Sequence, residues 1–113
     1  LAGQLHGSVA QGLGEATVEQ ILYDRESGQL LTGSFMDYGM PRADMMPDII
    51  SEESLVPSTN NPLGVKGGSE AGNCGMPSAI ILAVLDALAP LGVEDVPIPA
   101  TPQRVWQAIR DAG

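Results

Sequence analysis

The sequence predicts an α+β fold, in which about three helices pack with a small, mostly antiparallel sheet built around a hairpin. Two observations support this prediction. Apolar residues recur at helical spacing in separate stretches, and two short apolar runs flank a polar turn. The 113 residues are 43% hydrophobic and 17% charged, which is typical of a globular chain. Because aromatic residues make up only 4%, we expect a modest core of aliphatic side chains.

The first predicted helix covers residues 4–20. Its apolar stripe consists of Leu5, Val9, Leu13 and Ala16. Gly7, Gly12 and Gly14 weaken this helix by about 1 kcal/mol each relative to alanine. So many glycines indicate the close approach of another backbone or of a ligand, and the sequence does not distinguish the two.

The predicted hairpin follows, with strands at 21–23 and 29–33 around a turn at 24–28. Residues 37–47 lack periodicity and are expected to form a loop with one helical turn. Residues 48–57 have mixed apolar and acidic positions and are interpreted as a further strand. Together these segments supply the predicted sheet.

The second predicted helix spans residues 75–89, with Pro77 at its first position. Its apolar residues nearly encircle it, so it should be covered on most sides. Pro90 and Gly92 end it.

A third helix is predicted after the extended connector 96–99. Thr101 is its expected N-cap and Pro102 its first residue. Its expected buried stripe is Val105, Trp106 and Ile109.

Charge and composition exclude several classes of function. The net charge of −9 leaves no cationic cluster for nucleic acid or for an anionic membrane surface. No apolar run approaches the ~20 residues of a membrane span. Cys74 is the only cysteine, which fits a reducing compartment and a cytoplasmic location. His6 is the only histidine, so a multi-histidine metal site is excluded and no metal ligand is predicted.

A glycine-rich loop at 64–75 runs directly into the second helix. Open backbone N–H groups and a helix N-terminus can hold an anion or a pyrophosphate-bearing cofactor. The spacing matches neither a P-loop nor a dinucleotide fingerprint, so spacing alone favours an ordinary structural loop. Within it, Glu70 is either a general base or a carboxylate that favours the helix dipole, and the residues alone favour the second role.

Several ordered stretches resemble the large subunits of molybdenum hydroxylases, a family with xanthine dehydrogenases, carbon monoxide dehydrogenase-like enzymes and aldehyde oxidoreductases. The matching stretches are Gln4–Gly7, Ala10–Gly14, Gly33–Tyr38, Pro41–Asp44, Asn61–Gly67, Pro77–Ala79 and Asp86–Leu88. Because these stretches follow in order along nearly the whole chain, the resemblance is more specific than any single motif.

The resemblance implies that residues 1–113 are the C-terminal portion of a molybdopterin-binding domain. In the family, a glutamate takes a proton from a molybdenum-bound hydroxyl, whose oxygen attacks an electrophilic carbon while hydride passes to a sulfido ligand. The matching glutamate is Glu70. Gln4 matches a glutamine that contacts the pterin, and Gly67, Gly68 and Ser69 would line the same site.

The implied cofactor is molybdopterin, often as its cytosine dinucleotide. The implied partners are the rest of the large subunit, iron–sulfur and FAD domains or subunits, and a small-molecule substrate. One departure from the family is Ser69, which stands where a glycine usually precedes the glutamate. The other is size, because 113 residues cannot build the whole site.

Leu1 is not an initiator methionine, so we expect a segment of a longer oxidoreductase subunit that is inactive alone and binds no cofactor alone. The alternative is a stand-alone interaction or regulatory module derived from the family. An unrelated acidic binding domain is disfavoured by the ordered stretches.

Overall fold

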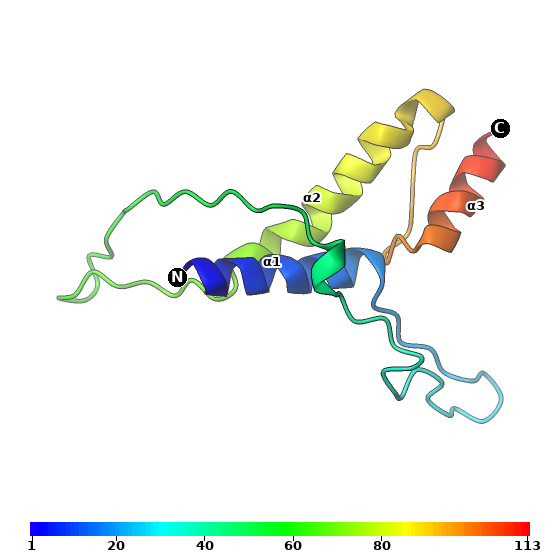
Figure 1. The fold of residues 1–113 in the computed structure, drawn as a ribbon, viewed down its shortest axis with the longest axis horizontal. Helices are drawn as coiled ribbons and strands as arrows, with labels where there is room; N and C mark the ends of the chain where they lie inside the picture. Colours follow the sequence, from blue (N-terminus) through cyan, green and yellow to red (C-terminus); the bar gives the residue numbers. More distant parts are fainter.

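The protein consists of three α-helices joined by long irregular segments (Figure 1). The computed structural model describes all residues, 1–113. The α-helices are α1 (Ala2–Thr17), α2 (Ala71–Leu88) and α3 (Pro102–Ala112), and the short 3₁₀ helices are η1 (Ala43–Met45) and η2 (Ala89–Leu91). The number of α-helices agrees with the sequence prediction, and η1 is the single helical turn expected within 37–47.

The predicted sheet is absent, so the α+β assignment is wrong. The segment around 21–33 turns back on itself, but only one isolated antiparallel bridge forms, between Tyr23 and Leu30. Residues 48–57, interpreted as a strand, have no regular secondary structure.

The physical reason is that nothing covers the apolar side chains of the would-be hairpin. Ile21 is 62% exposed and Tyr23 is 61% exposed, and Figure 1 shows this segment extending away from the helices. A two-stranded hairpin without a third strand or a packed helix is marginal in water.

α1 and α2 cross at close range because small residues face each other. A Cβ added to Gly12 of α1 would lie 2.6 Å from the Cβ of Met76 in α2. A Cβ added to Gly72 of α2 would lie 2.8 Å from the backbone nitrogen of Val9. The glycines at this crossing therefore admit another backbone, which is one of the two alternatives that the sequence left open.

Gly12→Ala should consequently destabilise the chain. Overpacking of a tight contact costs about 1–3 kcal/mol. Gly75→Ala is the matched control, since Gly75 lies in α2 with no atom near its would-be Cβ, and alanine there should gain up to ~1 kcal/mol of helix propensity. In urea unfolding followed by circular dichroism, the midpoint of Gly12→Ala should be lower than that of the parent and lower than that of Gly75→Ala. Equal midpoints would contradict the crossing.

α2 begins earlier than predicted, at Ala71, and Pro77 lies inside it instead of at its first position. Pro77 lacks an N–H, so the carbonyl of Asn73 loses its usual partner there. None of the residues of α2 is buried, so the expected covering on most sides is wrong for this chain. The stretch Ala71–Leu91 is long and apolar enough, by length and composition only, to cross a membrane, contrary to the sequence estimate. Core helices of larger domains can be equally long and equally apolar, so these two criteria alone are weak evidence for a membrane span. In this structure α2 packs across α1.

A small core joins the second half of α2 to α3. Its buried residues are Val93, Val96 and Ala100. Half-buried side chains of both helices pack against them, including Leu85 and Val105. The hydroxyl of Thr101 accepts a hydrogen bond from the Arg104 N–H at 3.3 Å, which confirms the predicted N-cap. Trp106 is 54% exposed, so its predicted burial is wrong.

The chain as a whole is open. Its radius of gyration is 17.8 Å, whereas a compact domain of this length has about 13 Å. Only 7 of 113 residues are buried. Most apolar side chains therefore lack the contacts that a self-contained core would give them.

Candidate active site

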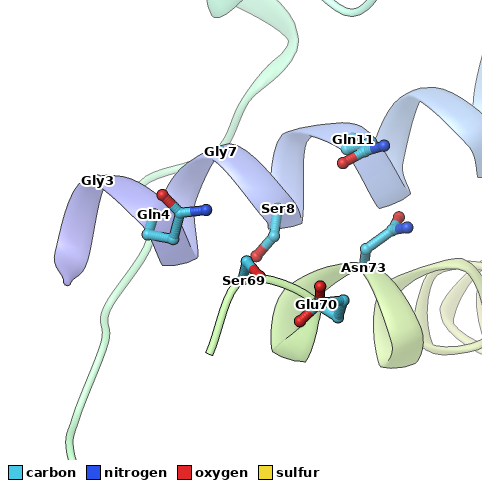
Figure 2. Close-up of a pocket in the computed structure, with 8 residues that line it drawn as sticks. All are labelled: Gly3, Gln4, Gly7, Ser8, Gln11, Ser69, Glu70 and Asn73. Atoms are coloured by element: carbon cyan, nitrogen blue, oxygen red, sulfur yellow. The ribbon is translucent and has the colours of Figure 1, made fainter. Parts of the chain in front are cut away.

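A polar pocket of about 380 Å³ lies where the N-terminal half of α1 meets the start of α2 (Figure 2). It has no apolar lining residue. The lining residues are Gly3, Gln4, Gly7, Ser8, Gln11, Ser69, Glu70 and Asn73. Helix α1 supplies the first five residues, and the loop end and first turn of α2 supply the others. The pocket therefore joins segments about sixty residues apart in the sequence.

Three of the five residues predicted for the site meet in this pocket, namely Gln4, Ser69 and Glu70. Gly67 and Gly68 instead line another pocket of about 380 Å³, which Leu1 and Lys66 also line. A Cβ on Gly68 would lie 3.8 Å from a methyl group of Leu1, so this part of the loop lies against the start of α1.

Glu70 occupies the N-cap position of α2, yet its side chain does not cap the helix. Its backbone carbonyl accepts a hydrogen bond from the Cys74 N–H at 3.0 Å, while its carboxylate makes no hydrogen bond within the chain. A residue selected for capping would use its side-chain oxygen on an N–H of the first turn. The free, exposed carboxylate instead borders the pocket, where it can accept a proton or a hydrogen bond.

The sequence interpretation missed Ser8, Gln11 and Asn73. A signal for two of them was present, because residues 4, 8 and 11 recur at helical spacing on one face of α1. That face is polar, whereas the periodicity that predicts helix burial is carried by the apolar stripe. Asn73 lies three residues after Glu70, so both lie on one side of α2, and Figure 2 shows both side chains beside α1.

Asn73 holds a buried oxygen without a partner. Its Oδ1 makes no hydrogen bond and lies against α1, 3.4 Å from where a Cβ of Gly12 would be. An unsatisfied buried acceptor costs about 1–3 kcal/mol. This oxygen faces α1 and not the pocket, so it is the lining of glycines and polar side chains that fits a ligand rich in hydrogen-bonding groups.

The groups with shifted pKa lie outside the pocket. The Glu19 carboxylate accepts a hydrogen bond from the Tyr38 hydroxyl at 2.8 Å and raises the pKa of Tyr38. The side-chain hydrogen bond from Ser27 lowers the pKa of Asp24. No Lys or Arg lines the pocket, so its only formal charge is that of Glu70. No three His, Cys, Asp or Glu side chains gather in a way that could hold a metal ion.

Comparison with known proteins identifies the family of this chain. The model of the molybdopterin cofactor-binding domain matches residues 1–47. The nicotine 6-hydroxylase large subunit of Paenarthrobacter nicotinovorans is 41% identical over 108 residues, which are 96% of this chain and 13% of that protein. The chain belongs to the molybdopterin-binding region of molybdenum hydroxylase large subunits.

Further relatives agree with this molybdenum hydroxylase assignment. The carbon monoxide dehydrogenase large chain of Hydrogenophaga pseudoflava is 33% identical, over 98% of this chain and 14% of that protein. The crystal structure of quinoline 2-oxidoreductase from Pseudomonas putida 86 superposes with a TM-score of 0.90 at 38% identity, over 97% of this chain and 14% of that one. The chain thus spans about a seventh of the length of these relatives.

Proposed function

We propose that this chain forms one side of the molybdopterin site of a molybdenum-dependent hydroxylase or dehydrogenase, in which Glu70 is the general base. The observation that carries the proposal is that Gln4 and Glu70, 66 positions apart, line one polar pocket. A cofactor contact and a proton acceptor must both reach the same reaction centre, and the shared pocket of Gln4 and Glu70 supports these two roles.

The lining residues fit a molybdopterin. A pterin carries several hydrogen-bond donors and acceptors; the amide of Gln4 offers both kinds of partner, and Asn73 offers the donor of its amide nitrogen. When bound, the cofactor would supply the molybdenum centre that accepts two electrons from the substrate. Gln4, Asn73 and the backbone of Gly67 and Gly68 would hold it, and its cytosine dinucleotide is one form that the family resemblance allows.

Glu70 would take the proton that must leave during hydroxylation. Its carboxylate is free of hydrogen bonds within the chain, so both oxygens remain available as acceptors. The first turn of α2 holds the Glu70 backbone through the Cys74 N–H, while the carboxylate remains free to rotate. Positioned general bases typically contribute about 10²–10⁴-fold to the rate.

Ser69 replaces the glycine usual before the glutamate, and it also lines the pocket. Its hydroxyl makes no hydrogen bond within the chain. We propose that it donates to the bound cofactor or substrate beside Glu70, so that the departure adds a donor and does not displace the base.

The remaining partners are proposed from the same assignment. The rest of the large subunit would cover the exposed apolar side chains of α2, and iron–sulfur and FAD domains or subunits would remove the electrons from the metal. The substrate would be a small molecule with an electrophilic carbon. A cytoplasmic location stays a prediction.

Gln4→Leu in the full-length protein tests the cofactor contact. Leucine removes a hydrogen bond without leaving a large void, so cofactor retention should weaken by about three- to tenfold, measured as molybdenum per protein after prolonged dialysis. Gln103→Leu is the matched control, because Gln103 is exposed in α3 outside the pocket. Equal molybdenum in both variants would contradict a role for Gln4.

A further inference from the structure

The loop that leads to Glu70 is held by one side-chain amide. The Nδ2 of Asn61 donates to the carbonyl of Val65 at 2.9 Å, and the Oδ1 of Asn61 accepts from the Val65 N–H at 3.0 Å. Both ends of the amide therefore bond to the backbone of the same residue, one to each of the two peptide groups that flank the Cα of Val65, which fixes the position and the orientation of Val65.

Backbone hydrogen bonds close the same loop around this amide. The Ser58 N–H donates to the carbonyl of Gly64 at 3.0 Å, and the Gly64 N–H donates to the carbonyl of Asn61 at 3.1 Å. Gly64 has a φ of 65°, which a residue with a Cβ rarely adopts. The loop from 58 to 65 is thus a closed unit, and the Asn61 amide makes its last two bonds before the glycine-rich stretch.

The next stretch has no such support. No hydrogen bond joins Lys66, Gly67, Gly68 or Ser69 to any other residue. Apart from the contact of Gly68 with Leu1, the stretch is held only at its ends, upstream at Val65 by the Asn61 amide and downstream at Glu70 by the first turn of α2. A short span between two anchors follows a path that the anchors set, because glycine itself restricts the path little.

We propose that Asn61 is a positioning residue for the pocket, which holds Gly67, Gly68 and Ser69 on the path that presents their backbone groups and the Glu70 carboxylate to the cofactor and substrate. The inference rests on the proposed function of Glu70. It assigns a role to a side chain that lies outside the pocket and touches neither Gln4 nor Glu70.

The amide chemistry explains why this residue type is needed. Aspartate would keep the acceptor for the Val65 N–H but would place a carboxylate oxygen against the Val65 carbonyl. Alanine would lose both bonds. Glutamine, with one further methylene, would displace its amide from the N–H and the carbonyl of Val65, four residues away in a closed loop.

The test uses the full-length, cofactor-loaded enzyme with Asn61→Ala and Asn61→Asp. The control is Asn60→Ala, since Asn60 is the adjacent residue of the same type and its side chain makes no hydrogen bond. The measurements are kcat, KM, the pH profile of kcat, molybdenum content and thermal unfolding temperature. If the role of Asn61 were purely structural, its substitution would change the molybdenum content and the thermal unfolding temperature but leave the shape of the pH profile intact.

For Asn61→Ala we expect a kcat about tenfold lower, in keeping with two lost hydrogen bonds, with molybdenum content unchanged and the acidic limb of the pH profile displaced. The kcat of Asn61→Asp should lie between those of Asn61→Ala and the parent. If Asn61→Ala does not fold, the kcat and the pH profile of Asn61→Asp test the role of Asn61. Asn60→Ala should match the parent.

The inference is overturned if the Asn61 variants match Asn60→Ala in kcat and pH profile, or if kcat falls only in proportion to molybdenum. Glu70→Gln distinguishes failure of the proposed role of Asn61 from failure of the proposed function of Glu70. An inactive Glu70→Gln beside a fully active Asn61→Ala removes the role of Asn61 alone, whereas an active Glu70→Gln removes the proposed function as well.

Discussion

Glu70→Gln in the full-length, cofactor-loaded enzyme is expected to lower turnover by about 10²–10⁴-fold, because that is what a positioned general base contributes. Glutamine keeps the size and polarity of the side chain but cannot take up a proton. The substitution should leave folding intact, because the carboxylate makes no hydrogen bond within the chain and does not cap α2.

Molybdenum content distinguishes loss of the base from loss of the cofactor. It should stay at the parent level in Glu70→Gln, while steady-state turnover collapses. The control is Glu53→Gln, which removes the same charge at an exposed position outside the pocket and should leave turnover unchanged. Retained turnover in Glu70→Gln would remove the assignment of the base.

The purified 113-residue chain, by contrast, should neither retain molybdenum stoichiometrically nor turn over substrate. The polar pocket has walls from α1 and the start of α2 only, and a ligand held on one side keeps most of its surface in water. Typical sites bury 70–90% or more of a drug-sized ligand. The measurements are metal analysis and a dye-reduction assay on the isolated chain, with the full-length protein as the positive control.

Self-association should accompany this inactivity. Side chains such as Phe35, Met36 and Ile50 are at least 84% exposed, and large exposed apolar surface drives association. Sedimentation of the isolated chain should show concentration-dependent oligomers. A stable monomer with bound molybdenum and measurable turnover would contradict the account.

The helices could be predicted from the sequence because their signals are local. Thr101 with Pro102 marks the start of α3, and Gly92, with a φ of 80°, marks the stop after α2. The start of α2 was misplaced by following Pro77, because proline is commoner at a first position than in an interior. The glycine-rich start of α2 gave no local sign that the helix had already begun.

The sheet was mispredicted because strand pairing depends on distant partners. The short apolar runs in 21–33 and in 48–57 are compatible with strands, but a strand is stable only when a neighbour covers its apolar face. The chain offers no such cover. The same dependence on distant partners explains the wrong prediction that α2 is covered on most sides. Its apolar residues nearly encircle the helix, which indicates burial, but no segment of this chain encloses it.

The site was predicted in part. Glu70, Ser69 and Gln4 came from the family resemblance, and the structure adds that they line one pocket. Ser8 and Asn73 were missed, because their place in the wall follows from the crossing of α1 and α2. That crossing depends on Gly12 meeting Met76 and on Gly72 meeting Val9, contacts between residues about sixty positions apart that no local pattern specifies.

The most direct test of the central claim is to locate the metal. Crystals of the full-length, cofactor-loaded protein, measured at the molybdenum absorption edge, give the metal position independently of any assumption about the pocket. The account predicts one anomalous peak at the α1–α2 pocket, within reach of the Glu70 carboxylate directly or through one metal ligand, with the pterin beside Gln4. A peak remote from this pocket, with Glu70 facing solvent or another subunit, would contradict the account.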